Sequence, residues 1–191
     1  MILERWFSLP IWYDHVGLDM APLAAKCLEM EAEGYPHRTV SNVGGWQSND
    51  VKMNEVDVFK PLLAHVEAKV GEVCRQIEQG FKVKYDNSWI NINRKGDANK
   101  AHCHPLTTLS ACIYLQAPEG CGNIIFHGND MVNHYPIFTD SPLFSTDVIY
   151  KPEAGKLLVF PACILHSVES NQSDEPRISI AFNFLPDREA Q

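Results

Sequence analysis

The alternation of apolar and polar residues divides the chain into a helical first part and a strand-rich second part. Segments 20–33 and 56–81 have the 3.6-residue spacing of amphipathic helices, and the second carries one long apolar stripe opposite Glu and Lys. From residue 83 the pattern changes to period two or to short apolar runs, which predicts strands. The strand candidates are 83–94, 107–116, 123–126, 148–151, 156–160, 164–169 and 177–185.

Three other segments complete the pattern. Segment 6–13 predicts a short edge strand, where Pro10 is tolerated because an edge position needs no donor. Segment 41–50 is rich in Gly, Asn and Ser and predicts a connecting loop, with a role in bordering a site left open for its part 44–50. Segment 128–146 is long and irregular, as lids and substrate loops are.

Helices followed by seven or eight short strands predict an α+β fold that is mainly β. We expect a sandwich or open barrel of the jelly-roll type, braced by the N-terminal helices. The 191 residues suit a single domain over 1–191, with 1–82 as helical support and 83–186 as the β core.

Composition narrows the function classes. Hydrophobic residues make up 45% and aromatic residues 10%, so a disordered chain is excluded. The net charge of -8 and scattered basic residues argue against a nucleic-acid partner. Six cysteines without a CxxC pair, and no secretory signal ahead of them, predict reduced thiols in a cytoplasmic protein. No apolar run reaches the length of a membrane span, so we expect no membrane partner.

The first candidate for chemistry is a pair of histidines. His102 and His104 stand two residues apart just before the strand predicted at 107–116. On a strand, side chains at i and i+2 point to one face, so the two imidazoles would project together. Neutral imidazoles are the commonest ligands of mid-to-late first-row metals. The alternative is one buried, hydrogen-bonded histidine and one surface histidine.

A second group of candidates lies on predicted strands that have one polar face. Arg177, Ser179, Ala181 and Asn183 alternate with four apolar residues, which is typical of a strand that lines a ligand pocket and packs on a core. Asn91 and Asn93 likewise share a face. Buried amides need partners, so these two contact either local loops or a polar ligand.

The order of these motifs resembles a known superfamily. An HxH pair, then His166 after a G-x-L-x-x-F-P strand, then Arg177 opening an R-x-S strand are similar to the iron(II)/2-oxoglutarate-dependent oxygenases, over about 89–185. With segments 7–12, 44–48 and 109–115, nearly the whole chain resembles a family of 2-oxoglutarate–iron(II) oxygenases of marine bacteria and phages. The resemblance implies a double-stranded β-helix core and a dioxygenase, a hydroxylase of an unidentified substrate, that uses Fe(II), 2-oxoglutarate and O2.

The resemblance also implies a role for each site residue. His102, His104 and His166 would be the iron ligands, with His104 where the superfamily usually has Asp or Glu. Arg177 would bind the distal carboxylate of 2-oxoglutarate, helped by Ser179 and Tyr114. Asn93 or Asn91 would lie near the other end of the co-substrate or near the iron.

Three histidines without a carboxylate leave other functions open. Such a site also suits a cupin-like oxygenase that uses no 2-oxo acid, or a zinc hydrolase. A non-catalytic binding protein on the same fold is a third alternative, because fold does not fix function. The substrate stays open between a small molecule and a protein side chain. A homodimer through an edge strand or the N-terminal helices is compatible with the pattern.

Overall fold

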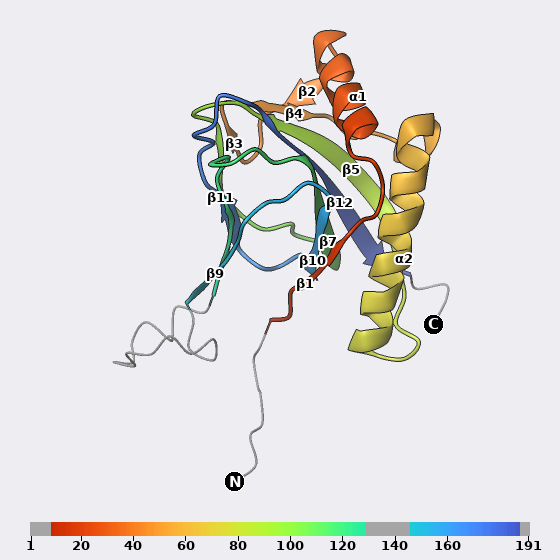
Figure 1. The fold of residues 1–191 in the computed structure, drawn as a ribbon. Coiled ribbons are helices and arrows are strands. Elements are labelled where there is room, and N and C mark those ends of the chain that lie inside the picture. The colour runs from red at the N-terminus through yellow and green to blue at the C-terminus, as the bar shows by residue number, and fades with distance from the viewer. Residues whose placement is uncertain (1–8, 129–145, 188–191) are drawn as a thin grey trace.

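Two antiparallel β-sheets lie across from each other, and two helices cover the outer face of the larger sheet (Figure 1). This computed structural model describes residues 9–128 and 146–187. The arrangement is that of a double-stranded β-helix, so the predicted mainly β fold braced by N-terminal helices is confirmed.

From Val83 onward the strands alternate between the two sheets in chain order, except that Ile124–His127 and the next described strand, Asp147–Tyr150, both belong to the smaller sheet. The seven-stranded sheet runs in the order β1 (Trp12–His15), β10 (Lys156–Pro161), β7 (Leu109–Gln116), β12 (Arg177–Pro186), β5 (Val83–Asn93), β4 (Trp46–Ser48) and β2 (His37–Arg38). The five-stranded sheet runs in the order β3 (Asn42–Val43), β6 (Ala98–His102), β11 (His166–Val168), β8 (Ile124–His127) and β9 (Asp147–Tyr150).

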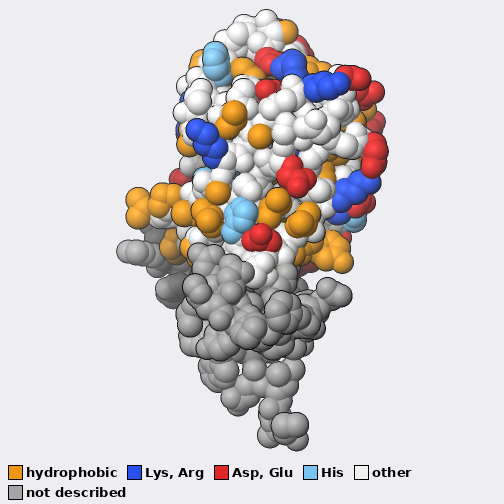
Figure 2. Space-filling model, turned by 90° about the vertical axis from the view of Figure 1, so that its left-hand side faces the viewer, with side chains coloured by type: hydrophobic (Ala, Val, Ile, Leu, Met, Phe, Trp, Pro, Cys, Tyr) orange, Lys and Arg blue, Asp and Glu red, His pale blue; other side chains and the backbone are white. Residues whose placement is uncertain are grey.

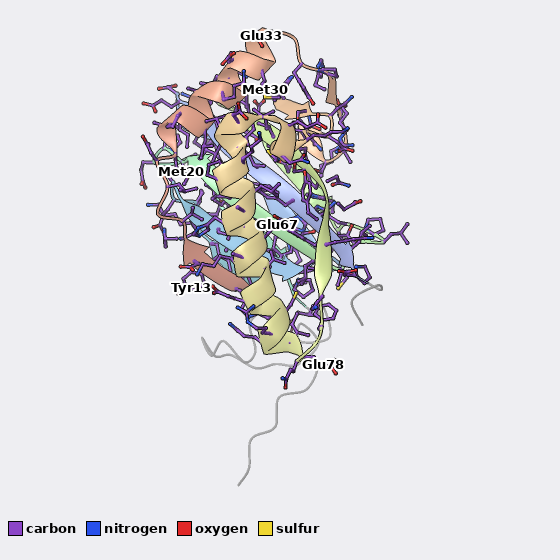
Figure 3. All side chains as sticks on the ribbon, turned by 90° about the vertical axis from the view of Figure 1, so that its right-hand side faces the viewer. Tyr13, Met20, Met30, Glu33, Glu67 and Glu78 are labelled. Atoms are coloured by element: carbon purple, nitrogen blue, oxygen red, sulfur yellow. The ribbon has the colours of Figure 1, made fainter. Side chains whose placement is uncertain are left out.

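The helices form where the sequence predicts them. Helix α1 (Ala21–Ala32) has a proline in its first turn and ends in a Schellman motif, in which Gly34 has φ +76° and the Tyr35 amide donates to the Met30 carbonyl. Two short 3-10 turns, η1 (Met53–Glu55) and η2 (Asp57–Phe59), lead into helix α2 (Lys60–Ile77). Figure 3 shows α2 lying across the face of the larger sheet.

Two apolar clusters hold these layers together. The larger cluster lies between the helices and the seven-stranded sheet, and α2 contributes its stripe of Leu62, Leu63, Val66, Val70, Val73 and Cys74. The smaller cluster lies between the two sheets and contains Tyr114, Ile124, Phe126, Leu158, Phe160 and Ile164. Polar side chains on the inner faces of both sheets line an interior cavity next to this smaller cluster.

The differences from the predicted elements lie in the short polar strands. All seven strands predicted after residue 82 are present, but β6 was missed because Ala98–His102 lacks apolar alternation. Segment 41–50, predicted as a loop, contains both β3, which pairs with β6, and β4, which pairs with β5. Residues 6–8 of the predicted N-terminal edge strand 6–13 lie outside the described residues, and the strand observed next to them is β1, Trp12–His15. Most of the predicted loop 128–146 is outside the described residues.

The outer face of the five-stranded sheet has no helix over it within the described part of the chain. Figure 2 shows apolar side chains on this face among charged ones, and β9 exposes Val148 and Ile149. All six cysteines are free thiols. None of the described helices combines the length and the apolar character that crossing a membrane requires.

Candidate active site

Three histidine rings meet between the sheets. His102 ends β6, His104 follows it by two residues, and His166 begins β11, directly opposite His102 in the strand register. Their ring centroids are 4.3–5.4 Å apart. One ring nitrogen of each lies within 4.8 Å of those of the other two. The i, i+2 spacing therefore does bring both members of the HxH pair to one point, although only His102 is in the strand.

The outer nitrogen of each ring is held by a neutral partner. His102 Nδ1 lies 2.7 Å from the Lys100 carbonyl, and His166 Nδ1 lies 2.9 Å from the Ile164 carbonyl. A carbonyl only accepts, so both Nδ1 atoms donate and both Nε2 atoms keep a lone pair. Hydrogen bonds of this type fix the orientation of metal-binding histidines.

His104 is held in the same way by side chains. Its Nδ1 lies 2.9 Å from Asn183 Oδ1 and 2.7 Å from Ser110 Oγ, and Ser110 itself donates to Asn183 Oδ1. His104 Nε2 is buried and has no hydrogen-bond partner. A buried polar atom without a partner is costly, and a metal ion bound by this atom would remove that cost.

Burial keeps the histidines neutral. Desolvation lowers the pKa of His166 to about 3, helped by the nearby His102, and lowers the pKa of His104 to about 4. The pKa of His102 is also lowered, mainly by burial. Metal binding requires a deprotonated imidazole nitrogen, so the site is in the state that accepts an ion at neutral pH.

Arg177 is buried in a cage of backbone carbonyls. It is 1% exposed, and its Nη1 donates to the carbonyls of Cys121, Gly122 and Glu169. Glycine at position 122 lets the backbones of Gly122 and Glu169 come close together around the guanidinium. Its φ is +85°, and a Cβ there would lie 2.5 Å from the Glu169 carbonyl oxygen. Nη2 is buried without a partner. No carboxylate among the described residues pairs with this guanidinium, although buried charges normally are paired.

One cavity joins the three histidines to Arg177. Its described lining includes Tyr114 and Cys112 on β7, Ser179 on β12, and Asn91 and Asn93 on β5. Burial raises the pKa of Tyr114 well above its usual value, so its hydroxyl stays protonated. Apart from the histidines, Arg177 is the only ionic side chain in this lining, and an anion would therefore be bound beside it.

Every residue predicted for the site lies at this cavity, but their roles as ligands stay predictions. The alternation on β12 was informative: Arg177, Ser179 and Ala181 line the cavity, while Ile178, Ile180 and the two phenylalanines enter the larger core. Sequence reasoning missed several lining residues, namely Ser41, Trp89, Asn99, Cys112 and Phe160. Trp89 and Cys112 could have been found, because each is two positions from a predicted site residue on the same strand.

A double-stranded β-helix with an HxH pair, a distal histidine and a buried arginine at one cavity defines the class of metal-dependent oxygenases with this fold. The family model described as "Putative 2OG-Fe(II) oxygenase" matches residues 87–183. The chain belongs to this family, and it is therefore an enzyme that uses Fe(II), 2-oxoglutarate and O2. A search of curated proteins gave no match.

Solved structures of low sequence identity share the fold. A prolyl-4-hydroxylase of Pseudomonas putida has a TM-score of 0.67 at 18% identity, over 92% of this chain and 91% of that one. A prolyl hydroxylase of Trichoplax adhaerens, in complex with a hypoxia inducible factor peptide fragment, has a TM-score of 0.70 at 13% identity, over 95% of this chain and 85% of that one. The α-ketoglutarate-dependent carbocyclase SnoK from nogalamycin biosynthesis has a TM-score of 0.65 at 16% identity, over 91% of this chain and 78% of that one.

Proposed function

We propose that the chain hydroxylates an organic substrate at a metal held by His102, His104 and His166, with 2-oxoglutarate held by Arg177. The observation that carries the proposal is the Arg177 guanidinium. It is buried, has no carboxylate partner among the described residues, and has a free Nη2 at the cavity where three imidazoles meet. A dicarboxylate that reaches from this guanidinium to a metal would satisfy both groups.

Each remaining residue has a definite task in this proposal. Tyr114 and Ser179 place hydroxyl groups beside Arg177, where they donate to the distal carboxylate. Asn93 also lines the cavity, but it lies opposite Arg177 in the strand register, so its amide contacts the co-substrate at the Arg177 end and not at the other end. Bound together, Fe(II), 2-oxoglutarate and O2 supply the oxidation that converts a C–H to a C–OH group and yields succinate and CO2. The chain holds these groups in a buried, oriented state.

The other three-histidine functions fit the cavity less well. A zinc hydrolase or an oxygenase without a 2-oxo acid would use the imidazoles but would leave the Arg177 charge uncompensated. A non-catalytic protein would need neither group. The neighbours include enzymes of peptides and of antibiotic biosynthesis, so we propose a small molecule or a protein side chain as substrate. A homodimer in the cytoplasm stays a prediction.

Metal and co-substrate binding test the proposal together. Chelator-treated protein is titrated anaerobically with Fe(II), and bound metal is measured before and after 2-oxoglutarate is added. We expect about one Fe(II) per chain and a visible charge-transfer band that forms only with 2-oxoglutarate. His166→Ala should lose both, whereas His15→Ala, an exposed histidine on β1, should keep both. Unchanged metal content in His166→Ala, or a metal site that ignores 2-oxoglutarate, would refute it.

A further inference from the structure

The larger sheet carries one row of polar side chains that extends past the cavity. The strand register places Tyr114 opposite Ser179, Ser179 opposite Asn91, Asn91 opposite Gln47, and Gln47 opposite Arg38. Residues directly opposite each other share a face, so Gln47 and Arg38 lie on the same face of the sheet as Tyr114, Ser179 and Asn91, which line the cavity. Figure 1 shows β4 and β2 extending the sheet beyond β5. The end with Tyr114 belongs to the proposed co-substrate site, and the end with Gln47 and Arg38 has no assigned role.

Two atoms in this unassigned end are buried and lack partners. Gln47 is 4% exposed and its Oε1 has no hydrogen bond, and Arg38 Nε is likewise buried without one. Cross-strand neighbours have Cβ atoms about 4.5–5.5 Å apart, so one small group can reach both. A ligand that offers a donor and an acceptor on adjacent atoms would give a partner to both the Gln47 acceptor and the Arg38 donor.

The end of the row with Gln47 and Arg38 lies close to the three histidines. The Arg38 guanidinium carbon lies 5.7 Å from the centroid of the Trp89 ring, and that ring lies 5.3 Å from the His104 ring, edge to face. Trp89 also lines the cavity. A substrate held by Gln47 and Arg38 would therefore pass over Trp89 and bring a neighbouring carbon to the histidines.

The charge of the subsite selects against an anion. Arg38 Nη2 lies 2.9 Å from Asp50 Oδ1, so its positive charge is already paired. A carboxylate ligand could accept from Arg38 Nε but could not donate to Gln47 Oε1, and the Asp50 carboxylate would repel it. An amide has the required C=O and N–H and no charge.

We infer that Gln47 and Arg38 form a substrate subsite that binds an uncharged amide, such as the backbone of a peptide, beside the metal site. The inference rests on the proposed function, because it takes the histidine cluster as the reacting centre. The amide oxygen accepts from Arg38 Nε, the amide N–H donates to Gln47 Oε1, and the substituent next to the amide packs on Trp89.

The test uses full-length protein loaded with Fe(II) and 2-oxoglutarate. The probes are N-acetyl N-methylamides of the standard amino acids, the same compounds with an extra methyl group on each amide nitrogen, so that every C=O stays and no amide N–H remains, and neutral polyols such as maltose. Succinate formation above the substrate-free rate is measured. We expect at least one capped amide to stimulate it, with its N-methylated form at least tenfold weaker. Gln47→Leu and Arg38→Lys should each raise the KM of that amide about tenfold, the effect of one lost hydrogen bond to a buried group.

Controls separate this inference from the proposed function. Gln172→Leu, an exposed glutamine, should leave the KM unchanged, and thermal melting verifies that each variant is folded. Failure of wild-type protein to bind 2-oxoglutarate would refute the proposed function itself. If 2-oxoglutarate binds, three results would each overturn the amide subsite alone: no response to any capped amide, an equal response to the N-methylated amides or to polyols, or unchanged KM in both variants.

Discussion

Replacing Arg177 with lysine should weaken 2-oxoglutarate binding much more than it destabilises the fold. Lysine keeps a positive charge but has no second nitrogen, so it cannot stay in the carbonyl cage and also grip a carboxylate. Each hydrogen bond to a charged group is worth about 1.5–3 kcal/mol. Losing one such hydrogen bond to the distal carboxylate therefore corresponds to a fall in the affinity for 2-oxoglutarate of about 10- to 150-fold, at 1.4 kcal/mol for each tenfold.

The same contacts set the expected change in stability. Arg177→Met would leave buried carbonyls without a donor, at about 1–3 kcal/mol, while removing a buried charge offsets part of this cost. We expect a net loss of about 1–2 kcal/mol in the free energy of unfolding, equivalent to a fall in Tm of about 2–8 °C. Arg177→Lys should lose less, because an ammonium can still donate to the carbonyls.

The assay is calorimetric titration of the Fe(II)-loaded protein under anaerobic conditions. 2-Oxobutyrate, which lacks the distal carboxylate, is titrated in parallel and should bind wild type and Arg177→Lys equally. Arg94→Lys is the matched control, since that arginine is more exposed and pairs with Glu31 away from the cavity. If Arg177→Lys binds 2-oxoglutarate as tightly as wild type, or loses 2-oxobutyrate binding to the same extent, the guanidinium does not grip the distal carboxylate.

Two further substitutions test the surroundings of the site. Asn183→Leu removes the acceptor that orients His104, and metal affinity should fall about 10- to 100-fold in chelator competition; Asn87→Leu, one residue further out, should change it little, and equal effects would contradict this role. Gly122→Ala and Gly80→Ala both force alanine to a positive φ, but only the first puts a Cβ 2.5 Å from a carbonyl oxygen. Urea unfolding should therefore show a loss for Gly122→Ala larger by about 1–3 kcal/mol, and equal losses would mean that the cage is not tightly packed.

The sequence predicted the fold wherever burial is strong and failed where strands are short and polar. Strand β12 is buried along most of its length, so the alternation of polar and apolar residues in its sequence follows directly from which of its two faces each residue is packed on. Strand β6 is Ala98–His102, with one buried residue, and its pairing is set by the strands around it. Strands β2 and β4 are two and three residues long, and no local pattern distinguishes such segments from a loop.

The same distinction applies to the cavity. Period two on one strand was enough to put Arg177 with Ser179, and Asn91 with Asn93, on a common face. Which residues face each other across strands depends on register, which the chain sets through long-range pairing. Gln47 was therefore not recognisable as a neighbour of Asn91, because 44 positions separate them and one strand pair joins them.

The electrostatics of the cavity connect the metal to the co-substrate. All three histidines are held by uncharged partners, the carbonyls of Lys100 and Ile164 and the Ser110–Asn183 pair. A divalent ion bound there would keep its full charge, where an aspartate or glutamate ligand would cancel part of it. With Arg177 the cavity would carry three positive charges, and the dianionic co-substrate would cancel two of them. Binding of the metal and of 2-oxoglutarate must then favour each other, and by linkage each raises the affinity for the other by the same factor. A three-histidine centre with an unpaired arginine is in this way complementary to a dicarboxylate, and much less so to a neutral or monoanionic ligand.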